Sequence, residues 1–246
     1  MADMQLIPSN WQLPDSIRRR LGRTVGYQRV MLEDDHLLIV AHEVPDPDTT
    51  SRKGVLFWKS AEGEWRASNG EPGKAAIEML LDRYEQRIRE FDNDESAAER
   101  ADQYLRVLEG LSPVSRSMKH FSTVLADARK AVPEASELID LRDRAYELAR
   151  MAELNYQDTR NEMDVAVIKR AELQAATSNK MERSAHRLNL MAAFFLPLAT
   201  LSSIFGTSFT EGWTWSETPF PFMVMLIVGL ASGVFLTIGL STWKNS

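Results

Sequence analysis

A set of small or mildly polar residues recurs near the C-terminal end of the sequence at alternating steps of three and four, the spacing of one helix face. Its members are Asn189, Ala192, Leu196, Ala199, Ser203 and Gly206. Leu196 is the large apolar member, and bulky side chains such as Phe194 and Leu198 fall on the other faces. Such a face can either pack closely against another helix or line a water-filled path. The residues alone favour packing, because small-residue faces are common in membrane helix bundles.

Residues suited to enzyme chemistry are dispersed through the chain. The sequence has no cysteine, which excludes a thiol nucleophile and a Cys-ligated metal site. The histidines show no metal-ligand spacing, and the sequence contains no Gly-rich phosphate loop and no nucleophile elbow. We therefore predict that the protein is not an enzyme and holds no resident cofactor.

The small-residue face belongs to the first of two charge-free stretches, which must place it as helices. They are Leu188–Phe205 and Phe220–Trp243, and each is long enough to cross hydrocarbon as a helix, which takes about 20 residues. A pair of buried core helices is the alternative, but a soluble fold of this size rarely contains two such stretches back to back. In the second stretch, Gly229 and Gly233 allow another helix to approach closely, most simply the first stretch.

The flanking charges predict an orientation. Lys180, Arg183 and Arg187 precede the first stretch, whereas the connection to the second carries Glu211 and Glu217 and no basic residue. By the positive-inside bias, both termini face the cytoplasm and the acidic connection is external.

The rest of the chain is charge-dense and mildly acidic. The 246 residues include 29 Lys and Arg and 35 Asp and Glu, and only Glu211, Glu217 and Lys244 of these lie after residue 188. This balance disfavours a nucleic-acid partner. Residues 1–20 contain no apolar run that could serve as a signal peptide.

The first seventy residues carry the strand character, with predicted strands at 27–33, 36–44, 54–59 and 64–67. From Gly73 onward the pattern is helical. We predict a first helix to about residue 93, a second over 94–109 and a third opened by Ser112-Pro113, a cap followed by proline. Residues 134–187 contain no Gly or Pro. Apolar residues there are spaced three and four apart, at Leu138, Leu141, Ala145, Leu148 and Ala152. We expect one continuous helix of about seventy residues that runs into the first charge-free stretch.

The predicted fold is a mainly α membrane protein with a small N-terminal α+β cytoplasmic domain and a long stalk helix that continues into the first of two transmembrane helices. The predicted segments are a cytoplasmic α+β domain at 1–72, a cytoplasmic helical region at 73–132, a stalk helix at 133–187, a first transmembrane helix at 188–208, an external acidic loop at 209–219, a second transmembrane helix at 220–243 and a cytoplasmic tail at 244–246.

The residues of the tail region resemble a known family. The first stretch contains Phe195-Leu196-Pro197-Leu198 and ends in Ile204-Phe205-Gly206, and a short acidic loop, a second stretch and a very short tail follow. Together with the long helix, this is similar to the CorA family of divalent-cation transporters, which includes the ZntB branch. The resemblance implies a funnel-shaped homopentamer in the inner membrane, in contact with lipid, that transports a divalent cation: magnesium, with zinc, cobalt and nickel as alternatives.

The resemblance also implies roles for the residues. The first transmembrane helix of the family lines a central pore, so the small-residue face becomes the pore lining and Leu196 its hydrophobic narrowing. At the outer mouth the family has Gly-Met-Asn, whereas this chain has Gly206-Thr207-Ser208. Hydroxyl groups can accept hydrogen bonds from a hydrated ion, but they are shorter and weaker acceptors than the Asn carbonyl. Glu211 and Glu217 raise the local cation concentration there.

At the inner mouth, Glu182 falls on the same face as the predicted lining, and its spacing predicts an acidic ring in a pentamer. The family also senses cytoplasmic Mg²⁺ through carboxylates between protomers. Candidates are Asp140, Asp143, Asp158 and Asp164, for which a solvated helix charge is the alternative that the pattern favours. Two functional hypotheses follow: a divalent-cation channel or transporter, which we favour, and a non-conducting, membrane-anchored regulatory or scaffold oligomer with a degenerate pore.

Overall fold

The computed structural model describes residues 7–22, 24–46, 52–205 and 220–243. The chain divides into two compact units, residues 1–169 and 170–246. The long helix α4 (Glu137–Phe205) contributes to both, as the predicted continuous helix requires. The finer division into cytoplasmic, stalk and transmembrane segments stays a prediction.

Unit 1 contains a four-stranded antiparallel meander in the order β1-β2-β3-β4. The strands are β1 (Arg29–Glu33), β2 (His36–His42), β3 (Gly54–Lys59) and β4 (Trp65–Ala67), each lying within a predicted strand or coinciding with it. Asp34 and Asp35 join β1 to β2 with φ angles of 47° and 59°. Two successive positive φ angles are the mark of a tight hairpin turn, and Asp adopts them more easily than most residues do.

Both faces of the sheet are covered. On one face, Trp11, Ile17 of α1 (Asp15–Arg20) and Trp58 belong to a buried cluster with Leu38 and Val40 of β2. On the other face, Leu37, Ile39 and Ala41 face the larger core. Alternate side chains of a strand point to opposite faces. Because both faces are covered, residues 37–41 of β2 are all apolar rather than alternating.

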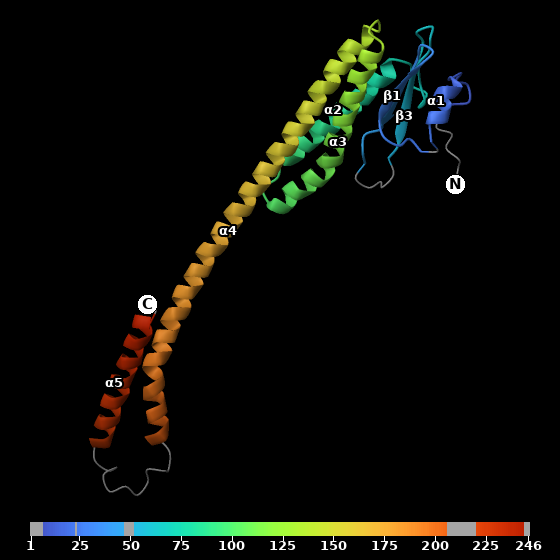
Figure 1. Ribbon diagram of the computed structural model, residues 1–246. Helices are drawn as coiled ribbons and strands as arrows, with labels where there is room; N and C mark the ends of the chain where they lie inside the picture. The colour runs from blue at the N-terminus through green and yellow to red at the C-terminus, as the bar shows by residue number, and fades with distance from the viewer. Residues whose placement is uncertain (1–6, 23, 47–51, 206–219, 244–246) are drawn as a thin grey trace. The chain divides into compact units, whose positions relative to one another are not determined.

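The larger core joins this second face to the helices α2 (Ala75–Ser96), α3 (Ala101–Ala131) and the first part of α4. Figure 1 shows α2 and α3 beside this part of α4. The predicted periodic residues are all buried here, at Leu138, Leu141, Ala145, Leu148 and Ala152. They form the stripe by which α4 joins the core.

The prediction that a third helix begins at Ser112-Pro113 is wrong, because α3 runs through Pro113 without a break. A proline inside a helix removes one hydrogen bond, here to the carbonyl of Glu109, and Glu109 is exposed to solvent that can hydrate it. Val107, Leu111 and Val114 on either side of the proline are buried in one core. Continuous packing therefore outweighs the local cost of the proline, which is about 3 kcal/mol.

The buried hydroxyl of Tyr84 links α2, α3 and the sheet. It lies 2.7 Å from Ser117 Oγ and within hydrogen-bond distance of the His42 carbonyl, at 3.2 Å. Burial raises the pKa of Tyr84, so the hydroxyl keeps its proton and can donate.

Tyr84→Phe is expected to lower the free energy of unfolding by about 1 to 2 kcal/mol, because it removes a buried hydroxyl and leaves its partners with fewer bonds. Urea unfolding followed by tryptophan fluorescence measures the change. Tyr146→Phe is the matched control, since Tyr146 is 68% exposed. Equal stability of the two variants would contradict the role given to the buried hydroxyl.

Unit 2 contains the C-terminal part of α4 and the helix α5 (Phe220–Trp243), which runs antiparallel to it (Figure 1). Over the parts of the chain that the structure describes, no helix has the length and the apolar character that a membrane crossing requires.

Candidate functional site

The contact between α4 and α5 uses the two glycines that the sequence predicted. A Cβ atom at Gly233 would lie 2.6 Å from the carbonyl oxygen of Phe194, and one at Gly229 would lie 2.9 Å from Leu198 Cδ1. Both distances are shorter than normal contacts of a Cβ atom. The contact at Gly233 is with a backbone atom, so only glycine allows this approach there, whereas the end of the Leu198 side chain near Gly229 can shift. The small-xxx-small pair therefore packs on the first charge-free stretch, as expected.

The small-residue face of α4 lies on another side of the helix. Leu196 is 65% exposed within the chain, and the other described members are also exposed: Asn189, Ala192, Ala199 and Ser203. At about 100° per residue, Ser203 lies about 180° around the helix from Phe194. Packing against α5 thus involves the face of Phe194 and Leu198, and the small residues stay uncovered in the single chain.

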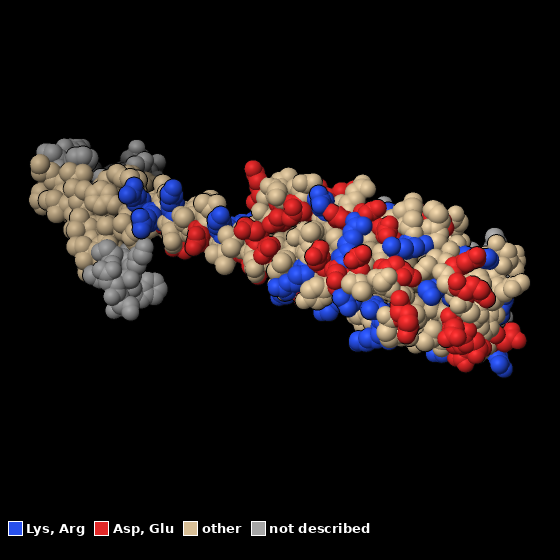
Figure 2. Space-filling model, turned by 90° about the horizontal axis from the view of Figure 1, so that it is seen from above, with Lys and Arg blue, Asp and Glu red and all other residues tan. Residues whose placement is uncertain are grey.

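The residues predicted for the two mouths are only partly described. Glu182 is exposed on α4, close in sequence to Lys180, Arg183 and Arg187. Gly206 of the small-residue face lies outside the described residues, and so do the outer-mouth residues Thr207, Ser208, Glu211 and Glu217. Figure 2 shows that described Lys and Arg side chains border a region of unit 2 without charged side chains.

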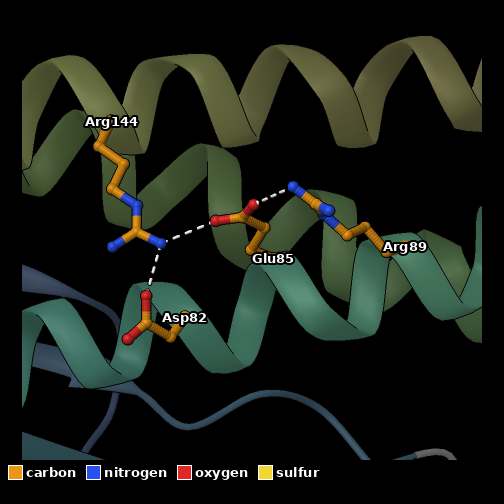
Figure 3. A network of polar contacts seen from close by, with 4 residues as sticks. All are labelled: Asp82, Glu85, Arg89 and Arg144. Atoms are coloured by element: carbon orange, nitrogen blue, oxygen red, sulfur yellow. Dashed lines mark hydrogen bonds and ion pairs between the residues drawn. The ribbon is translucent and has the colours of Figure 1, made fainter.

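The sequence analysis missed a polar network in unit 1, shown in Figure 3. Arg144 of α4 contacts two carboxylates of α2, with its Nη2 atom 2.5 Å from Asp82 Oδ1 and 2.7 Å from Glu85 Oε2. The second oxygen of Glu85 lies 2.5 Å from Arg89 Nη2. The signal available in the sequence was the spacing of Asp82, Glu85 and Arg89 along one face of α2, but nothing in it identified Arg144 as the partner.

This network makes unit 1 sensitive to acid. The hydrogen bond from Arg144 lowers the pKa of Glu85 below its usual value of 4.5. Because the pKa of Glu85 is lower in the folded state than in the unfolded chain, the ion pair contributes fully to the free energy of unfolding when the pH is above the usual pKa. This contribution to stability decreases once the pH falls below the usual pKa, and it is lost when the pH has passed below the lowered pKa of the folded state.

Arg144→Leu is expected to reduce the free energy of unfolding at neutral pH by about 1 kcal/mol or less, because the network is partly exposed to solvent. The variant also loses less stability than the parent between about pH 5 and pH 3. Urea unfolding at both pH values measures this difference. Arg150→Leu on the same helix is the control, since Arg150 lies 4.0 Å from Glu153 and is 57% exposed. The same acid dependence in parent and Arg144→Leu would refute the assignment.

The predicted sensor carboxylates form no metal site within one chain. Asp143 pairs with Arg142 at 2.7 Å. Among the described residues, no group of three or more His, Asp or Glu side chains could hold a metal ion.

Several solved structures share this fold, among them the following two. The structure of the full-length CmaX protein matches with a TM-score of 0.57 and 14% identity, over 95% of this chain and 83% of that one. The complete structure of the CorA magnesium transporter from Methanocaldococcus jannaschii matches with a TM-score of 0.51 and 13% identity, over 92% of this chain and 82% of that one. No curated protein matches the sequence.

The fold of a small sheet covered by helices, with a very long helix and a shorter antiparallel one, is thus shared with a protein described as a magnesium transporter. The family model described as CorA-like Mg²⁺ transporter protein matches residues 29–239. The chain belongs to this family, as its tail residues predicted.

Proposed function

We propose that the chain forms a homopentameric channel or transporter for divalent cations in the inner membrane. Membership of the CorA-like Mg²⁺ transporter family supports this function, and the similar structure from Methanocaldococcus jannaschii is described as a magnesium transporter. In this proposal residues 188–208 and 220–243 cross the lipid, and both termini face the cytoplasm.

The observation that carries the proposal is the uncovered small-residue face of α4. Two helices of one chain cannot enclose a path, so conduction requires several copies around an axis. The glycines of α5 engage the face of Phe194 and Leu198, which leaves the face of Asn189, Leu196 and Ser203 free to meet other copies. In the pentamer this face lines the pore, and Leu196 forms its narrowing.

The ends of the path differ in chemistry. Glu182 forms an acidic ring at the inner mouth. At the outer mouth the hydroxyls of Thr207 and Ser208 follow Gly206 and accept hydrogen bonds from the water shell of the ion, which suits Mg²⁺ because it dehydrates reluctantly. Glu211 and Glu217 concentrate cations near the entrance.

Ion flux into liposomes tests this function. The purified protein is reconstituted, and indicators inside the vesicles report Mg²⁺, Zn²⁺, Co²⁺ and Ni²⁺ separately. We expect the flux of at least one divalent ion to exceed that of empty vesicles. The order of the rates for the four ions shows which of them is preferred by an outer mouth formed by Thr207 and Ser208. A folded pentamer that passes none of these ions would contradict the transport proposal and would favour a non-conducting regulatory or scaffold oligomer.

A further inference from the structure

Three basic side chains form a basic face on α4 directly before the charge-free stretch. They are Lys180, Arg183 and Arg187, and the steps of three and four between them are the spacing of one helix face. All three residues are exposed. Within the described part of the chain, no carboxylate forms an ion pair with any of them. Three unpaired positive charges on one side of a helix form a surface that attracts anions.

The basic face and the small-residue face lie on opposite sides of α4. At about 100° per residue, the three basic residues lie between about 140° and 200° around the helix from Leu196, whereas Glu182 lies only about 40° from it. In the proposed pentamer Leu196 points to the axis. Glu182 then lies on the inner side, and the basic face points to the periphery, away from the ion path.

Large exposed apolar side chains continue this outward surface over the next turns of the helix. Leu188 is 66% exposed, Met191 60% and Phe195 58%. They lie between about 220° and 280° from Leu196 in the same sense of rotation, next to the basic face. The boundary between basic and uncharged side chains of this unit is visible in Figure 2. Cations followed along the helix by exposed apolar side chains fit a phospholipid, which joins an anionic headgroup to acyl chains.

The basic face also lies at the depth of lipid headgroups. If the hydrocarbon begins near Leu188, Arg187 and Arg183 lie about 2 Å and 8 Å before it along the helix, and Lys180 about 12 Å before it. The headgroup layer on one side of a bilayer is about 5 to 7 Å thick. Electrostatic attraction extends about 10 Å further into the solution at 0.1 M salt. All three charges can therefore act on headgroups.

We infer that the basic face binds the headgroups of anionic phospholipids in the cytoplasmic leaflet, with their acyl chains beside Met191 and Phe195. Arg183 and Arg187 make the main contacts, because a planar guanidinium can donate two parallel hydrogen bonds to one phosphate. The inference rests on the proposed function in one respect, the crossing of the membrane by residues 188–208. It does not require that ions pass.

Lipid retention by the purified full-length protein tests this inference. The immobilised protein is incubated in detergent with equal amounts of phosphatidylglycerol and phosphatidylcholine that carry the same acyl chains. It is then washed, and the retained lipids are quantified by mass spectrometry. We expect phosphatidylglycerol to exceed phosphatidylcholine at least about tenfold. Arg183→Gln and Arg187→Gln should each lower this ratio about fivefold, the effect of one basic residue near an anionic surface.

Arg170→Gln is the matched control. It removes the same charge from an exposed residue of the same helix, about 20 Å of helix before Arg183. This distance exceeds the range of the attraction, so the lipid ratio should stay within about twofold of the parent. Equal retention of the two lipids by the parent would overturn the inference. An equal loss of preference in Arg170→Gln would do so as well.

Two other targets of the basic face are distinguished in the same assay. If inorganic phosphate displaces the bound phosphatidylglycerol more than sodium chloride does at equal ionic strength, the face binds a soluble anion and the inference is wrong. The second target is the partial negative charge at the C-terminal end of α5. The glycine contacts of α5 with Phe194 and Leu198 imply that this end lies near Arg187. If the arginine variants keep the lipid ratio but dissociate at a lower temperature without lipid, the face serves α5 instead.

The liposome assay separates this inference from the proposed transport. Intact lipid preference in a protein without flux contradicts transport alone. Equal retention of both lipids by a protein that conducts contradicts the lipid site alone.

Discussion

Leu196→Trp is expected to reduce divalent-cation flux through the reconstituted protein to the level of empty vesicles. Leu196 is 65% exposed on the face of α4 opposite α5, and in the proposed pentamer it forms the narrowest part of the path. Five indole rings around one axis fill a constriction that five leucines leave passable, and a hydrophobic constriction controls conduction. The liposome assay with ion indicators measures the effect.

Phe195→Trp is the control for this substitution. Phe195 is also well exposed, at 58%, but it lies about 100° around the helix from Leu196. This variant should conduct as the parent does. Size-exclusion chromatography must show the same oligomer for both variants. Parent-like flux in Leu196→Trp would mean that this face does not line the path.

Gly233→Leu is expected to separate α5 from α4 and to destabilise the proposed oligomer. The first side-chain atom alone would lie 2.6 Å from the Phe194 carbonyl oxygen, and a backbone atom cannot move aside without moving its helix. Overpacking of this kind costs about 1 to 3 kcal/mol in one chain, and every copy of an oligomer bears it. A clear fall in the temperature at which the purified oligomer dissociates, followed by size-exclusion chromatography after heating, is the expected result.

Ala231→Leu is the matched variant for this prediction, since Ala231 lies two residues away on the same helix and is exposed. It adds similar bulk without entering the contact with α4. If both variants lower the dissociation temperature equally, the effect comes from added bulk on α5 rather than from the close approach at Gly233.

The periodic apolar residues made much of unit 1 predictable. The core stripe of α4 from Leu138 to Ala152 follows from spacing, because burial of one face imposes a period on the sequence. The strands follow from short runs of strand-forming residues bounded by turn residues. The helix start predicted at Ser112-Pro113 was wrong. The apolar residues on both sides of Pro113 pack in one core, and this packing outweighs the local preference of proline for a helix start.

The functional features depended on information that spacing does not carry. The small residues of α4 can be placed on one face from the sequence, but only the structure shows that Phe194 and Leu198 form the contact with α5. Arg144 meets Asp82 and Glu85 across 62 and 59 residues of sequence, and no local pattern predicts such a pairing.

The order of the strands has a consequence for biosynthesis. Each strand of the meander pairs with its neighbour in sequence, so the hairpins can form as the chain emerges from the ribosome, and such local contacts favour fast folding. The last residue of the α4 core stripe, Ala152, precedes the charge-free stretch that begins at Leu188 by a segment that takes about 2 to 7 seconds to synthesise. Helix-rich domains fold in far less time than this. Ala152 leaves the ribosome earlier than Leu188 by the same interval, so the apolar core of unit 1 can close before the apolar tail emerges, and the two do not compete for each other during translation.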